Sequence, residues 1–172
     1  MLRRHVTTAV AALALLAAAG AATPALLGPP WMSIEYPINP YDREVRGAYL
    51  VVHTFHHQIP TGLPMSGRAE GLVNGTRRTV TLSFGTTSRA SDFTLKQQWP
   101  QDGSWVLVIE SRQGEGEFNQ VTALVDIGRD GRVSGVRVPT TRNREGYQVP
   151  AAVTPADVDA ALARVSQVAS RP

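Results

Sequence analysis

The sequence predicts an all-β fold: an immunoglobulin-like antiparallel β-sandwich of about seven to eight strands, followed by a short C-terminal amphipathic helix. Three observations lead to this prediction. Short segments of alternating apolar and polar residues recur along residues 31–138, turn residues separate them at short intervals, and no segment of helical period interrupts them. A sandwich domain has about 100 residues, so residues 31–138 of the 172-residue chain form one predicted domain.

The N-terminal segment, residues 1–25, has the layout of a secretory signal peptide. Basic residues at positions 3–5 precede an apolar run at 6–19, and small residues follow, with predicted cleavage near Ala22 or Ala25. We therefore expect a secreted or periplasmic protein. The alternative is a leader retained as a membrane anchor, but a spanning helix needs about 20 strongly apolar residues, and this run is mostly alanine. Once the leader is cleaved, no stable membrane insertion is expected.

Composition narrows the possible partners. The chain has no cysteine, so neither a lipid-modified thiol nor a disulfide is available. Removing the two leader arginines changes 17 Lys and Arg against 14 Asp and Glu into 15 against 14. The remaining basic residues are scattered, whereas nucleic-acid binding needs a concentrated basic face. We expect no nucleic-acid partner.

The strands follow from alternation and turn signals. Eight segments are predicted as strands: 31–36, 47–57, 68–73, 78–84, 92–99, 104–111, 120–127 and 132–138. Asn74-Gly75 stands between the third and the fourth, and this dipeptide is the strongest short signal for a hairpin with a type I′ turn. The segments 47–57 and 104–111 are apolar on both faces, which is typical of central strands covered on both sides.

The C-terminal part differs from the sandwich. Residues 139–154 are polar and are interrupted by proline, which predicts a linker or an extended arm. Residues 155–169 form the predicted helix, with Thr154 as its cap and Pro155 at its first position. Its apolar stripe consists of Val158, Leu162 and Val165. A helix of this length is marginal alone in water, so the stripe packs either on the sandwich or on a partner.

The segment Trp99-Pro100-Gln101-Asp102-Gly103-Ser104-Trp105 leads into an apolar strand. With the preceding hairpin and loops it resembles small exported bacterial β-sandwich domains of the YtkA-like and copper-resistance-C-like kind, over residues 31–127. The resemblance implies a non-enzymatic envelope protein, accessory to a larger membrane or metal-handling system. Copper carriers of that kind carry a histidine at the mature N-terminus, whereas no histidine lies between the predicted cleavage site and His53.

Four residues are candidate metal ligands: His53, His56, His57 and Met65. Imidazole and thioether groups suit soft metals such as copper. On an extended strand, however, His56 and His57 point to opposite faces, and His53 stands about 13 Å from His57. A shared site needs the strand to end by His56. The alternative interpretation is two polar residues at a strand end and a buried or half-buried His53.

No catalytic constellation is apparent, because the chain lacks a Gly-x-Ser-x-Gly elbow and nothing places a base beside a nucleophile. We therefore expect neither an enzyme nor a cofactor. Trp99 and Trp105 align with aliphatic neighbours, which favours a core role over ligand binding. Two hypotheses remain: a non-catalytic module that binds a protein of the cell envelope, and a periplasmic protein that binds copper or another soft metal.

Overall fold

The computed structural model describes residues 28–116 and 118–168, so the predicted signal peptide lies outside the described residues. The strands are β1 (Pro30–Glu35), β2 (Leu50–His56), β3 (Ile59–Pro60), β4 (Met65–Val73), β5 (Thr76–Thr81), β6 (Gly85–Thr86), β7 (Asp92–Leu95), β8 (Ser104–Arg112), β9 (Gln120–Ile127), β10 (Val133–Arg137), β11 (Thr140–Arg142) and β12 (Gln148–Pro150). A 3-10 turn, η1 (Arg43–Val45), and one α-helix, α2 (Pro155–Val168), complete the described elements.

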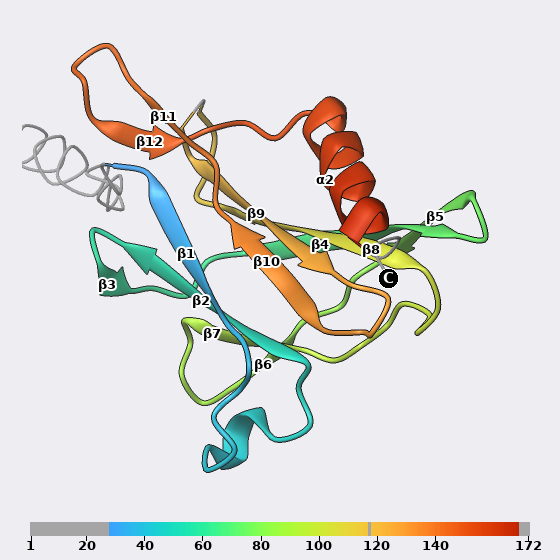
Figure 1. The fold of residues 1–172 in the computed structure, drawn as a ribbon. Helices are drawn as coiled ribbons and strands as arrows, with labels where there is room; N and C mark the ends of the chain where they lie inside the picture. Colours follow the sequence, from blue (N-terminus) through green and yellow to red (C-terminus); the bar gives the residue numbers. More distant parts are fainter. Residues whose placement is uncertain (1–27, 117, 169–172) are drawn as a thin grey trace, which may run out of the picture.

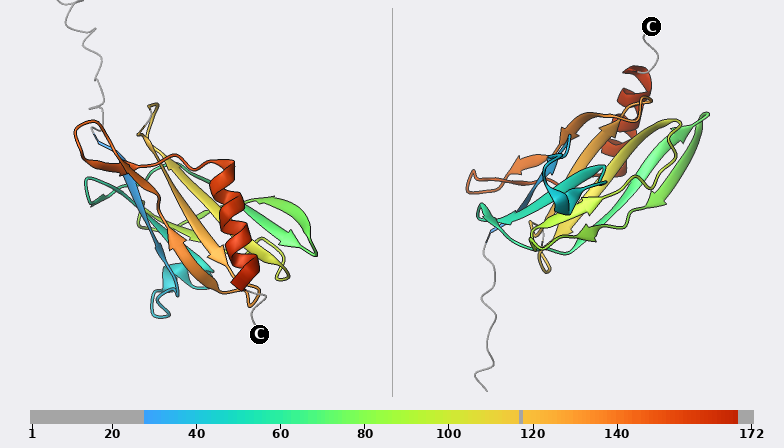
Figure 2. Two further views of the ribbon diagram at one scale, coloured as in Figure 1. Left: turned by 45° about the horizontal axis from the view of Figure 1, so that its top comes forward. Right: turned by 90° about the horizontal axis from the view of Figure 1, so that it is seen from below.

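The strands β1 to β10 form two packed antiparallel sheets (Figure 1). Sheet A has the order β1-β2-β7-β6, with β3 paired to the end of β2, and sheet B has the order β10-β9-β8-β4-β5. Figure 2 shows the layers: α2 lies outside sheet B, and sheet A lies on the other side of sheet B. The predicted all-β sandwich with a C-terminal helix is confirmed.

The hairpin between β4 and β5 forms where the sequence places it. Asn74 and Gly75 both have positive φ, 50° and 77°, which is the backbone of a type I′ turn. The flanking residues Val73 and Thr76 are register partners. The turn chemistry therefore fixes the pairing of these two strands.

Two predicted strands end several residues earlier in the structure. The segment 92–99 leaves the sheet after Leu95, and the segment 78–84 leaves it after Thr81. Beyond these points, the side chain of Gln98 replaces strand pairing. Its Oε1 accepts from the backbone N of Ser83 at 2.9 Å, and its Nε2 donates to the backbone O of Ser83 at 2.7 Å. The strand pairing can therefore end here, because the Gln98 side chain bonds both the backbone N and the backbone O of Ser83 and leaves neither unpaired.

The main core fills the space between the two sheets. Every second residue of β8 and β9 points into it, beginning with Trp105 and Val121. Sheet A contributes Leu50, Val52 and Met32 from the opposite side. Trp99 and Trp105 are 4% and 1% exposed, so they are part of the core, as the alternation predicts.

A second apolar layer lies between sheet B and α2. Val106, Val108 and Leu124 point out of the sandwich and pack against the helix stripe, which consists of Val158, Ala161, Leu162 and Val165. The two apolar faces of the 104–111 segment thus have separate covers, the other sheet and the helix. The predicted stripe of α2 docks on its own sandwich.

Polar contacts hold α2 in place. Thr154 and Asp157 cap its start reciprocally: the Thr154 backbone N donates to Asp157 Oδ2 at 2.8 Å, and the Asp157 backbone N donates to Thr154 Oγ1 at 3.3 Å. Arg77 on β5 bridges Glu70 of β4 and Asp159 of the helix. Among the described residues, no helix is long and apolar enough to cross a membrane.

The segment predicted as a linker or extended arm contains a small hairpin, β11 and β12. Asn143 organises its turn, since its Oδ1 accepts from the backbone N of Glu145 at 3.1 Å and of Tyr147 at 2.9 Å. Gly146 supplies the positive φ of 84° that this turn requires. The connection to α2 is therefore an extended arm with internal pairing (Figure 1).

Candidate functional site

His53 lies on the outer face of sheet A between two carboxylates. Its Nδ1 is 2.9 Å from Asp92 Oδ1 on β7, and its Nε2 is 3.1 Å from Glu35 Oε2 on β1. The pairing register brings the three strands together here, because His53 is the partner of Asp92. Both ring nitrogens therefore contact protein oxygens, and His53 is the centre of a polar chain across sheet A.

The chain continues from Asp92 to the loop that contains η1. Arg89 binds Asp92 and also reaches Asp42, where the Nη2 to Oδ2 distance is 2.6 Å. Burial acts to raise the pKa of Asp92, but hydrogen bonds from Arg89 and His53 outweigh it and hold the pKa below its usual value. Glu44 extends the contact, since its Oε2 accepts from the backbone N of Ser88 at 2.9 Å. This network ties β1, β2, β7 and the η1 loop into one polar surface.

The other predicted metal ligands lie elsewhere. His56 ends β2 on the inward face and is 7% exposed. His57 stands in the following turn with φ of 51°, and the two rings meet edge-on with centroids 4.3 Å apart. Met65 opens β4 in the opposite sheet and packs against the main core.

The part of the chain that the structure describes contains no group of three or more His, Cys, Asp or Glu side chains that could hold a metal ion. The structure gathers Glu35 and Asp92 around His53 and places His56 on the other face of the strand. The soft-metal alternative stays a prediction.

The geometry around His53 also bears on nucleophilic catalysis. Ser33 is the register partner of His53 on β1, so a serine, a histidine and an aspartate follow one another across the sheet. The hydrogen bond of His53 Nε2 goes to Glu35, however, and a serine nucleophile needs that nitrogen as its base. Both ring nitrogens contact carboxylates in this arrangement, so His53 is not placed to act as the base of Ser33.

Next to the polar chain lies an apolar row. Trp31, Phe55 and Pro60 are register partners on β1, β2 and β3. Trp31 is 40% exposed, and a shallow hollow of about 300 Å³ is lined by Trp31, Ser33, Phe55 and Gln58. An aromatic row bordered by polar side chains is the composition of a protein contact surface.

Sequence reasoning did not single out Glu35, Asp92 or Trp31. The alternation in residues 31–36 could have indicated an exposed Trp31. It places this indole on the same face as Ser33 and Glu35, which are too polar for a core. The carboxylate partners of His53 lie 18 and 39 residues away from it. They could be found only with the strand register in hand.

Comparison with known proteins adds no relative: no protein-family model, no curated protein and no solved structure matches the chain. The fold and the site therefore define the class on their own, an antiparallel β-sandwich with a helix over one sheet and an aromatic and ionic surface on the other.

Proposed function

We propose that this is an exported, non-catalytic binding module that attaches to a protein component of the cell envelope through the outer face of sheet A. The signal-peptide pattern of residues 1–25 supports export. The position of His53 between two carboxylates supports a binding surface over a catalytic one.

The contrast between the two outer faces of the sandwich carries the proposal. On sheet B, Val106 and Val108 are 0% and 1% exposed because α2 covers them. On sheet A, the row of Trp31, Phe55 and Pro60 remains accessible. Exposed apolar patches with polar borders often mark interaction sites, and aromatic residues are enriched among the side chains that contribute most to binding.

Close polar contacts connect the side chains that border this row. Glu35, His53 and Asp92 hold one another, and Arg89 ties them to the η1 loop. Pre-organised side chains lose little conformational entropy on binding. A partner that covers the aromatic row therefore meets a surface of fixed shape with oxygen acceptors along one side.

Photocrosslinking in intact cells tests the proposal. A photoreactive amino acid at Ser33 lines the hollow, and one at Ala160 on the exposed side of α2 serves as the matched control. We expect one protein adduct at Ser33 and none at Ala160, with the adduct lost when Trp31→Ala is added. Equal adducts at both positions, or an adduct that survives Trp31→Ala, contradict the assignment of this face.

A further inference from the structure

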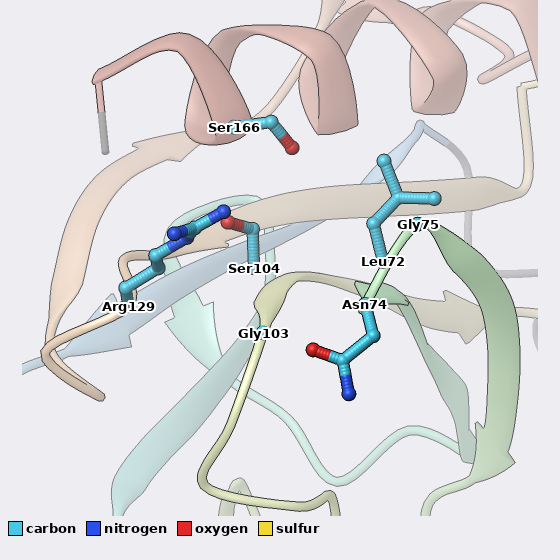
Figure 3. A pocket seen from close by; sticks show the side chains of 7 residues that line it. All are labelled: Leu72, Asn74, Gly75, Gly103, Ser104, Arg129 and Ser166. Carbon is cyan, nitrogen blue, oxygen red and sulfur yellow. The ribbon is translucent and has the colours of Figure 1, made fainter. Parts of the chain in front are cut away.

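A second hollow lies on the opposite side of the molecule, where the space between sheet B and the last turn of α2 opens to solvent (Figure 3). Its volume is about 370 Å³. Five segments meet there: the end of β4, the β4–β5 turn, the start of β8, the β9–β10 turn and the C-terminal end of α2. The lining residues are Leu72, Asn74, Gly75, Gly103, Ser104, Arg129 and Ser166.

Ser104 is the central polar group of this pocket. It is the first residue of β8, is 2% exposed, and directs its hydroxyl into the pocket (Figure 3). A hydroxyl that faces a pocket can donate one hydrogen bond to an acceptor that is bound there.

Two further polar groups point into the same space. The hydroxyl of Ser166 comes from the helix side, and the guanidinium of Arg129 comes from the β9–β10 turn (Figure 3). The amide of Asn74 points away from them (Figure 3). The lining therefore places the cation of Arg129 and the hydroxyl of Ser104 beside the apolar wall of Leu72.

The charges around the pocket favour a ligand of low charge. Among the described residues of the lining, Arg129 is the only charged one. The carboxylate of its neighbour Asp130 and the C-terminal end of α2, which carries about half a negative charge, lower the positive potential at Arg129. A carboxylate, with a single negative charge, therefore fits this site better than a phosphate group at about −1.5 to −2.

We propose that this pocket binds a small monocarboxylate. Its carboxylate pairs with Arg129 and accepts from the hydroxyl of Ser104, and its hydrocarbon part lies against Leu72. Arginine suits this role because its planar fork of donors fits a carboxylate. The site lies on the far side of the sandwich from the sheet A face, so the two proposals stand or fall separately.

Amide chemical shifts of the leaderless protein test the proposal, with butyrate as the probe and phosphate and chloride compared at constant ionic strength. We expect saturable butyrate shifts at Gly75, Gly103 and Ser104 with a Kd near 1 mM or below, about −4 kcal/mol. Arg129→Gln should weaken binding about tenfold or more, the effect of losing a charged hydrogen-bond partner. Ser104→Ala should weaken it severalfold and leave the protein folded.

Arg132→Gln is the matched control, because Arg132 is an exposed arginine of the same turn that does not line the pocket. Its butyrate affinity should equal that of the wild type. Shifts that are as large with phosphate, or a loss in Arg132→Gln equal to that in Arg129→Gln, mean general charge attraction and overturn the proposal. Shifts that stay linear to about 50 mM, far above the expected Kd, overturn it as well.

Discussion

Replacing Leu162 with alanine tests whether α2 is an integral layer of the fold. Leu162 is 3% exposed and packs with the outward side chains of sheet B, among them Val106 and Leu124. The substitution removes three carbon atoms at about 0.8 kcal/mol each, and incomplete collapse of the site adds a cavity term. We expect the free energy of unfolding to fall by about 3 kcal/mol, within the usual total stability of a domain.

Urea unfolding of the leaderless protein, followed by tryptophan fluorescence, measures this change. With an m value of about 2 kcal/mol/M, the midpoint should fall by about 1.5 M. Gln167→Ala, an exposed change on the same helix, is the control and should stay within about 0.5 kcal/mol of the wild type. If Leu162→Ala unfolds at the same urea concentration as Gln167→Ala, α2 does not pack on sheet B in solution and the layer argument fails.

Three further predictions follow from single features. In Gly71→Ala, the new Cβ would stand 2.4 Å from ring atoms of Trp105, so overpacking should lower the free energy of unfolding by about 1 to 3 kcal/mol, and an unchanged urea midpoint contradicts that close approach. Burial acts to raise the pKa of Glu70, but its two arginine partners hold the pKa below the usual value. Its contribution is therefore present above the unfolded-state pKa of about 4.3 and is lost as the pH falls through the folded value. Glu70→Gln should cost about 1 to 2 kcal/mol at pH 7, and this difference from the wild type should shrink below pH 4.3; a constant difference in pH-dependent urea unfolding refutes it. Calorimetric titration with Cu(I) and Cu(II) should show no binding tighter than about 1 μM, and tight binding that disappears in the His56 and His57 double alanine variant would instead establish the soft-metal function.

Much of the fold could be predicted from local chemistry. Asn74 and Gly75 both tolerate the positive φ that a type I′ turn requires. The hairpin between β4 and β5 can therefore be predicted from these two residues. The double alternation of residues 104–111 correctly indicates a strand covered on both sides. The pattern does not say that one of the covers is a helix more than 40 residues further along the chain, because periodicity reports burial and not the identity of the neighbour.

The candidate site could not be predicted in the same way, because it depends on register. Glu35, His53 and Asp92 form one row only when β1, β2 and β7 pair as they do. A shift of one residue would turn His53 away from the shared face. Turn and alternation signals fix where strands lie in the sequence, but the order of strands in a sheet is set by packing over the whole domain.

The strand β2 connects the fold to the proposed function. Its sequence, like that of β8, is apolar on both faces and indicates cover on both sides. In β8 that expectation is met within the chain, because α2 lies over Val106 and Val108. In β2 it is met only in part: Val51 is fully buried on the outer face, whereas Phe55, four residues further along the same face, lies in the floor of an open hollow. Cover from a second protein over Phe55 would make the two strands equivalent, which is why a partner on sheet A agrees best with the pattern of this sequence.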